Sequence, residues 1–239
     1  MKMTRAATTL AVSLVIALVA AACASMSGGG PDLVARGLQA QGGVDKLTAV
    51  KTVSQKATVR NWEPEQSMVA GGEMRFANES TVVMDTDVRA RATRMDWVRK
   101  YDPAPRSFTY SEIVTAEAGY VAGIDSNGRN KQSLESNPPA HSMSGLRLAA
   151  AQRELLRTSP VLLLEMSKNP DRVAATRDVT VGGSSYPAVT YRAVSQTFTV
   201  MFDRTTGLPA RVRTLDYDNI WGDVTYDLVL ADWQVVEGV

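Results

Sequence analysis

The sequence from Lys51 onward repeats short stretches in which apolar and polar residues alternate, and one stretch with helical spacing interrupts them. Alternation with a period of two is typical of strands that bury one face. The interruption, 145–169, places leucine and alanine three or four residues apart, as in an amphipathic helix. The order helix, strands, two helices, strands predicts an α+β fold, in which helices cover one face of a curved antiparallel sheet.

The pattern also predicts where the elements lie. Helices are expected at 31–43, with Pro31 and Asp32 in the first turn and Gly42 as the C-cap, at 44–50, and twice within 145–169, where Ser159-Pro160 begins the second. A polar loop is expected at 126–144. Strands are expected at 51–60, 67–77, 80–87, 88–101 and 222–236, and hairpins at 107–125, 179–194 and 196–218.

The first 22 residues resemble an export signal. Lys2 and Arg5 precede a mostly apolar run over 10–19, and small residues follow up to Cys23. The apolar run is too short for a settled transmembrane helix. We therefore expect residues 1–22 to be removed on export, and residues 23–31, rich in serine and glycine, to form a flexible tether.

Cys23 is the only cysteine, so the chain forms no internal disulfide. Its position after Ala20-Ala21-Ala22 resembles the lipobox of bacterial lipoproteins, in which the cysteine is diacylated and becomes the new N-terminus. Leucine is usual where Ala20 stands, and cleavage of an ordinary Ala-x-Ala signal to give a soluble periplasmic protein is the alternative. Lipidation would anchor the chain in a membrane and remove a reactive thiol. Since Ala24 is not the aspartate typical of inner-membrane retention, the resemblance favours the outer membrane.

The composition suits a globular protein, because 44% of the residues are hydrophobic and 21% are charged. Lysine and arginine are spread singly, and the formal net charge is only +1, which excludes the basic patch that nucleic-acid binding requires. We expect residues 32–239 to form one β-rich domain.

No catalytic constellation is visible in the sequence. His141 is the only histidine, so a zinc-binding histidine cluster cannot form, and no Gly-x-Ser-x-Gly nucleophile elbow occurs. Gly71-Gly72 and Gly182-Gly183 stand in hairpin context, as turns rather than phosphate-binding loops. We therefore expect the chain to have no catalytic residue, metal site or cofactor of its own.

Three acidic pairs need separate consideration: Asp85 with Asp87, Asp216 with Asp218, and Asp223 with Asp227. The segment Asp216-Tyr217-Asp218-Asn219 is similar to the start of a calcium loop, but the glycine and closing glutamate of such a loop are missing. Solvated turn residues are the simpler interpretation.

The aromatic residues mostly lie within or beside the expected strands. They could line a lipid-sized cavity, or fill the core beneath the sheet, which is the simpler hypothesis. The residues in question are Trp62, Trp97, Trp221, Trp233, Tyr110, Tyr120 and Tyr191.

Several segments, in order, resemble one known domain. The opening "LQAQGGVDKLTAVKTV" is similar to the start of an N-terminal domain found in exported metallo-β-lactamase-fold hydrolases. Later segments of that domain resemble "RMDWVRKYDPAP", "GYVAGIDSNG", "GLRLAAAQRELLRTSPVLLL" and "GDVTYDLVLADWQVVEGV". The hairpin "FDRTTGLPARV" also resembles a strand pair of the lipoprotein-carrier (LolA/LolB-like) half-barrel.

The resemblance implies a curved antiparallel half-barrel with helices on its concave face. In such proteins a hydrolase domain follows, and its zinc is bound by a His-x-His-x-Asp-His motif. That motif is absent here, so no catalytic or zinc residue carries over. The turn signal at Glu237-Gly238 has no return strand, which predicts that the chain stops before such a domain.

Three functions follow from these observations. The first is that the chain is an accessory module of an exported metallohydrolase, whose zinc would lie in the missing domain. Alternatively, it is a stand-alone envelope lipoprotein that binds a lipid or another apolar ligand in its half-barrel. The third alternative is a structural envelope lipoprotein without a small ligand.

Overall fold

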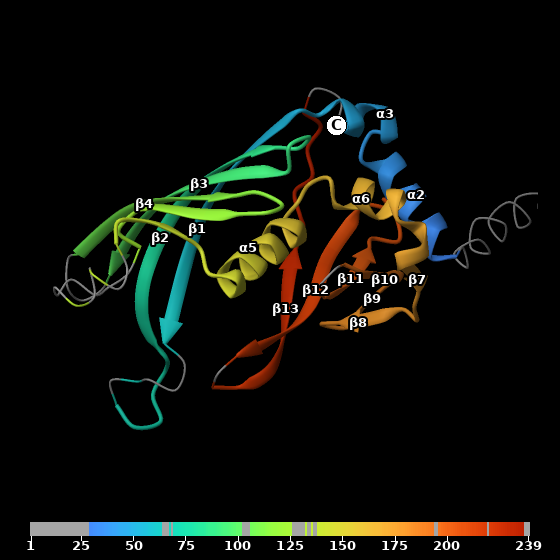
Figure 1. Ribbon diagram of the computed structural model, residues 1–239. Coiled ribbons are helices and arrows are strands. Elements are labelled where there is room, and N and C mark those ends of the chain that lie inside the picture. Colours follow the sequence, from blue (N-terminus) through green and yellow to red (C-terminus); the bar gives the residue numbers. More distant parts are fainter. Residues whose placement is uncertain are drawn as a thin grey trace, which may run out of the picture. The chain divides into compact units, whose positions relative to one another are not determined.

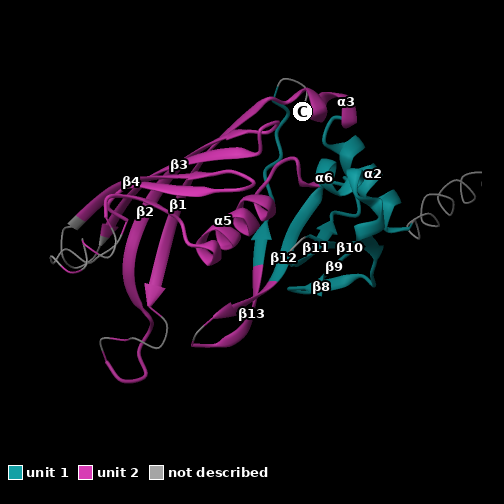
Figure 2. Ribbon diagram, in the orientation of Figure 1, with its two compact units in different colours: residues 1–43, 163–214, 227–237 teal, residues 44–162, 215–226, 238–239 magenta. Residues whose placement is uncertain are grey.

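The computed structural model describes residues 29–63, 67, 69–101, 106–125, 132, 135, 138–193, 196–218 and 220–236 (Figure 1). The chain divides into two compact units, shown in different colours in Figure 2. One unit takes its described residues from 1–43, 163–214 and 227–237, and the other takes them from 44–162, 215–226 and 238–239. Each unit contains a multi-stranded sheet.

The unit that begins at Val44 is built on a six-stranded sheet. Its strands follow one another in chain order, and every neighbouring pair is antiparallel. The helices are α3 (Val44–Ala49) and α5 (Gly145–Arg157). The strands are β1 (Thr52–Glu63), β2 (Arg75–Asp87), β3 (Ala92–Tyr101), β4 (Arg106–Val114), β5 (Gly119–Gly123) and β6 (Ala140–Ser142).

The register of this sheet decides which side chains share a face. Met84 of β2 lies opposite Met95 of β3, which lies opposite Glu112 of β4. Since side chains alternate along a strand, residues two positions away lie on the same face. Val82, Trp97 and Tyr110, which also lie opposite one another, therefore join that face.

Short polar side chains fix the tight connections between these strands. Asp87 accepts hydrogen bonds from the backbone N–H groups of Arg89 (2.9 Å) and Ala90 (2.8 Å) at the end of β2. Thr115 Oγ1 accepts from the N–H of Ala118 (3.0 Å) between β4 and β5. Such local bonds are why aspartate and threonine favour turns.

The other unit contains the five-stranded sheet, in the order β13-β12-β11-β10-β7. The strands β8 and β9 form a separate hairpin, and β12 and β13 each continue across the boundary between the units. The elements are α2 (Gly30–Ala40), α6 (Leu162–Lys168), the 3₁₀ turn η1 (Pro170–Arg172), β7 (Val173–Ala175), β8 (Val179–Val181), β9 (Ser184–Tyr186), β10 (Ala188–Arg192), β11 (Thr197–Phe202), β12 (Pro209–Asp218) and β13 (Gly222–Val229).

Close approach of α2 to its neighbours shapes the core of this unit. Leu33, Val34 and Leu38 are buried on one side of the helix. A Cβ atom at Gly37 would lie 2.7 Å from Cε1 of Phe202, and one at Gly30 would lie 2.8 Å from the backbone nitrogen of Ala175. Both positions therefore require glycine for α2 to pack this tightly.

The α+β class with antiparallel sheets is confirmed, but the expectation of one sheet is wrong. The described strands form sheets of six, five and two strands, and no sheet is closed or strongly curled. Along the sequence, α5 and α6 lie between β6, the last strand of the six-stranded sheet, and β7, the first strand of the five-stranded sheet. Helices were correctly expected within 31–43 and 145–169, and the hairpin turns at Gly182-Gly183 and 203–207 are also confirmed.

Three predicted strands differ from the structure. The strand expected at 88–101 begins only at Ala92, because residues 88–91 form a turn. The strand expected at 67–77 is wrong, because residues 69–72 form a bend and turn, with Gly71 at φ +70°, and β2 begins only at Arg75. The last strand ends at Val229 rather than at Val236. Asp232 has φ +54°, a left-handed conformation that a strand cannot accommodate, so 230–236 run without regular structure despite their alternating pattern.

The predicted signal peptide (1–22), the lipidation site Cys23, most of the tether and the turn at Glu237-Gly238 lie outside the described residues. The single-domain expectation for 32–239 stays a prediction. Among the described residues, no helix has both the length and the hydropathy needed to cross a bilayer.

Candidate functional site

Helix α5 covers part of one face of the six-stranded sheet (Figure 1). It begins cleanly, because Ser144 Oγ caps it by accepting from the backbone N–H of Arg147 (3.2 Å). Leu148, Ala151 and Leu155 recur at helical spacing and face the sheet. They pack against a cluster formed by Val82, Met95 and Val114, with Ala57, Met84, Trp97 and Met143 around it.

The apolar side chains of α5 pack only loosely against the sheet. Leu148, Ala151 and Leu155 are only partly buried, while Leu146 is 88% exposed. Methionine contributes much of the facing surface, through Met84, Met95 and Met143. Because methionine is flexible and adapts to irregular gaps, these contacts do not by themselves fix the helix in one position.

Ion pairs hold the first turn of α5 to the sheet. Arg147 binds Glu112 of β4 with one guanidinium nitrogen and Asp125 with the other. The side chains of Glu112 and Asp125 are only 14% and 7% exposed, so their charges need this partner. Burial alone would lower the pKa of Arg147, but the hydrogen bonds to Glu112 and Asp125 outweigh it and raise that pKa. Arg147 therefore stays charged.

Glu112 also contacts a group of aromatic side chains. It accepts a hydrogen bond from Trp97 Nε1 (2.9 Å). Trp97 stacks on Tyr110 with ring centroids 6.1 Å apart, and Arg99 Nη2 donates to the Tyr110 hydroxyl (3.0 Å). Burial raises the pKa of Tyr110 to about 12, so its hydroxyl stays protonated at neutral pH and cannot act as a general base there.

A second set of ion pairs holds the end of α5 to the hairpin of β12 and β13. Arg153 Nε lies 3.1 Å from Asp216 Oδ1, and Arg157 Nη1 lies 3.2 Å from Asp216 Oδ2. The Arg157 guanidinium also lies 5.0 Å from the centre of the Tyr226 ring. Charged contacts therefore secure α5 at both ends.

The acidic pairs singled out in the sequence have different positions. Asp216 holds α5 rather than lying in a solvated turn, so that interpretation is wrong for this residue. Asp87 and Asp218 each accept two backbone N–H hydrogen bonds in turns, as expected. Asp85 and Asp223 are exposed on their strands.

Asp227 lies on β13 rather than in a turn, and it is ion-paired. It binds Arg213 (2.6 Å and 2.7 Å) and Arg211 (3.4 Å) of β12, and the hydrogen bond from Arg213 is the main reason that its pKa is lowered. Among the described residues, no group of three or more His, Cys, Asp or Glu side chains is placed to hold a metal ion. His141 Nδ1 lies 2.7 Å from the backbone oxygen of Pro138.

The aromatic residues do not form one set. Tyr110 and Tyr191 are buried, as the core hypothesis expected, and Trp97 is half-buried beneath α5. Trp62, Trp221, Trp233 and Tyr120 are exposed, so the core interpretation is wrong for these four.

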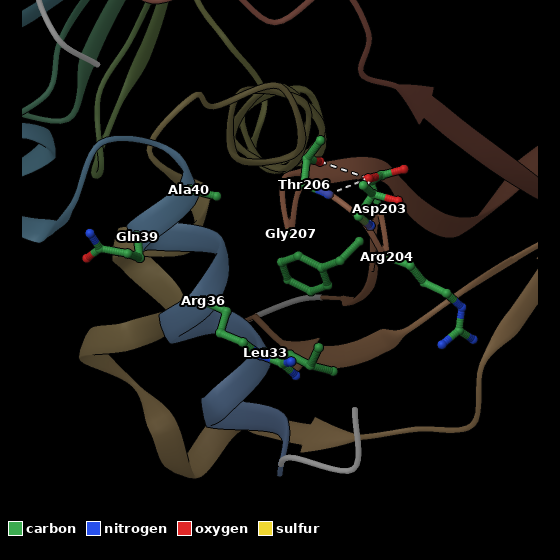
Figure 3. A pocket seen from close by; sticks show the side chains of 10 residues that line it. Leu33, Arg36, Gln39, Ala40, Asp203, Arg204, Thr206 and Gly207 are labelled. Carbon is green, nitrogen blue, oxygen red and sulfur yellow. Dashed lines mark hydrogen bonds between the residues drawn. The ribbon is translucent and has the colours of Figure 1, made fainter. Parts of the chain in front are cut away.

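The unit that contains α2 has a hollow of about 410 Å³ between that helix and the β11–β12 turn (Figure 3). Asp203 organises the turn by accepting from the N–H (2.7 Å) and hydroxyl (2.9 Å) of Thr206, and these bonds lower its pKa. Arg204 extends away from α2 and pairs with Asp178. On the β11–β12 side of the hollow, Asp203 and Thr206 therefore stabilise the turn itself.

Sequence reasoning missed the residues that fix α5: Glu112, Asp125, Arg147, Arg153 and Arg157. Arginines on one side of the predicted helix are a signal that could have suggested partners. Their acidic partners lie on β4, after β5 and on β12, and sequence spacing does not reveal such long-range pairs.

No family model matches the chain, and no curated protein matches it either.

The Arg147 ion pairs predict a measurable cost. Arg147→Met leaves two largely buried carboxylates without their partner and should lower the free energy of unfolding by about 2 kcal/mol. The matched control is Arg94→Met, because Arg94 pairs with Asp96 on an exposed part of β3, and its loss should lower the free energy of unfolding much less than the loss of Arg147 does. Urea denaturation of both variants measures the difference, and equal effects would contradict the assignment.

Proposed function

We propose that this chain is a non-catalytic domain of an exported bacterial envelope lipoprotein, similar to the N-terminal accessory module of metallo-β-lactamase-fold hydrolases. The envelope location rests on the resemblance of residues 1–22 and Cys23 to a lipoprotein signal. The observation that carries the non-catalytic part of the proposal is that the largely buried carboxylates Glu112 and Asp125 both bind Arg147. These groups hold a helix on a sheet and are not left as an open acid–base pair for a substrate.

The architecture is consistent with this proposal. Antiparallel strands carry α5 on one face of the six-stranded sheet, as the resemblance to the accessory domain implies. The curved LolA/LolB-like half-barrel, with helices on its concave face, is the finer part of the proposal. Zinc would belong to a hydrolase domain with a His-x-His-x-Asp-His motif, since this sequence lacks that motif.

The proposed location is the cell envelope. Residues 1–22 would direct export, Cys23 would carry the lipid, and residues 23–31 would separate the folded part from the membrane. The resemblance favours the outer membrane, facing the periplasm, and a soluble periplasmic protein is the alternative.

Replacing Cys23 tests the anchor directly. In a bacterial host, Cys23→Ala should move the protein from the membrane pellet to the soluble periplasmic fraction, because acyl chains contribute about 0.8 kcal/mol per buried CH₂ group. Ser25→Ala, two residues further on, is the control and should leave the protein in the pellet. Mass spectrometry of the wild-type N-terminus should show a diacylated Cys23.

Two results would contradict the proposal. A Cys23→Ala protein that stays in the pellet, or an unmodified wild-type Cys23, would reject lipid anchoring. For the accessory role, a gene that encodes a His-x-His-x-Asp-His motif beyond Val239 supports the proposal, and a stop codon directly after Val239 contradicts it.

The partial burial of the apolar side chains of α5 favours a second function. The sheet face beneath this helix is apolar and rich in methionine, and the apolar side chains of α5 are only partly buried against it. Such a face suits a lipid or another apolar ligand that replaces α5 on the sheet. We propose this binding as the alternative function of a stand-alone lipoprotein.

Binding of a fluorescent fatty acid to the soluble Cys23→Ala protein tests this alternative. Saturable binding is expected, and adding Arg147→Met should tighten it about threefold or more, because displacing α5 then costs less. Adding Arg94→Met instead should leave the affinity unchanged. Absence of saturable binding, or equal effects of the two arginine variants, would reject the alternative.

A further inference from the structure

Four large apolar side chains are exposed together where β12 turns into β13. Leu215 is 61% exposed and Tyr217 is 77% exposed, and Ile220 and Trp221 are each about half exposed. We call these four residues the tip patch. Single exposed apolar residues are ordinary, but a group this dense within seven residues is typical of an interaction surface.

The strand geometry turns this patch away from α5. Asp216 lies between Leu215 and Tyr217, and it binds Arg153 and Arg157 of α5. Because successive side chains of a strand point to opposite faces, Leu215 and Tyr217 lie on the face of β12 opposite to that helix. Helix α5 therefore does not cover Leu215 and Tyr217, and the exposure of Ile220 and Trp221 is given by their accessible surface.

Hydrogen bonds hold the backbone at Ile220 and Trp221. Asp218 Oδ1 accepts hydrogen bonds from the backbone N–H groups of Ile220 (2.8 Å) and Trp221 (2.9 Å). Gly222, at φ +75°, directs the chain back into β13. A surface that is already ordered loses less conformational entropy on binding, and tryptophan and tyrosine are the residues most often found at binding hot spots.

The charges around the patch define the chemistry of a partner. Residues 215–226 contain three aspartates and no lysine or arginine, and Arg211 and Arg213, which precede them on β12, are both paired with Asp227. Asp216 is balanced by α5, which leaves Asp218 and the exposed Asp223 as carboxylates beside the patch. Carboxylates and the faces of Tyr217 and Trp221 both attract cations, whereas an anionic lipid surface would be repelled.

We propose that the tip patch docks a segment of a partner protein in which lysine or arginine alternates with apolar residues. The apolar residues would cover Leu215, Tyr217, Ile220 and Trp221, and the basic residues would pair with Asp218 and Asp223. This inference does not depend on lipidation or on binding beneath α5.

Selection from a random twelve-residue peptide library tests the proposal. The soluble full chain carrying Cys23→Ala serves as bait, and the same chain with Tyr217→Ser and Trp221→Ser removes background binders. The retained peptides should be enriched in lysine and arginine next to apolar residues. Enrichment of acidic peptides, or no enrichment, would overturn the proposal.

The best peptide then gives dissociation constants for matched variants. Tyr217→Ser alone should weaken binding tenfold or more, and Asp223→Asn should weaken it about threefold. Val69→Ser is the control, because Val69 is an equally exposed apolar residue elsewhere in the same unit, and it should change nothing. An equal loss with Val69→Ser would contradict a specific patch.

A membrane is tested as the competing occupant. Vesicles of phosphatidylethanolamine and phosphatidylglycerol are mixed with the Cys23→Ala protein and collected by centrifugation. We expect no binding that depends on Tyr217 and Trp221. Vesicle binding that disappears in the Tyr217→Ser, Trp221→Ser protein would assign the patch to lipid and overturn the proposal.

Discussion

The contact between Arg147 and the pair Glu112 and Asp125 determines where α5 lies on the six-stranded sheet. Ion pairs that leave water add little net stability but are costly to break. We infer that here they select one position of α5 over others. The apolar contacts of α5, which are partial and rich in methionine, attract the helix to the sheet without fixing its position. The ion pairs therefore position α5, and its apolar side chains attract it to the sheet.

The opposite end of α5 connects this arrangement to the β12–β13 hairpin. Asp216 binds two arginines of the helix on one face of β12, and Leu215 and Tyr217 of the tip patch lie on the other face. One short hairpin thus serves two purposes, because the alternation of a strand separates them. Its charged face stabilises the unit internally, and its apolar face is left exposed.

Much of the fold follows from local sequence signals, and the candidate site does not. The hairpin at Gly182-Gly183, the turn at Asp203 and the helix capped by Ser144 each depend on residues close in sequence. The pairing of Arg147 with Glu112 joins residues 35 positions apart, which no spacing rule predicts. The predicted length of the last strand was too great, because the alternation of apolar and polar residues continues past Val229. Asp232 nevertheless adopts a conformation outside strand geometry, which the alternation does not reveal.

Native-state hydrogen exchange of the α5 backbone amides tests most directly whether end ion pairs position this helix. We predict that α5 opens at a lower free energy than β2, β3 and β4, as a separate unit. The difference should widen in Arg147→Met, because that variant removes the ion pairs to Glu112 and Asp125. Exchange of α5 at the same free energy as these strands, in the wild type and in Arg147→Met, would contradict the account.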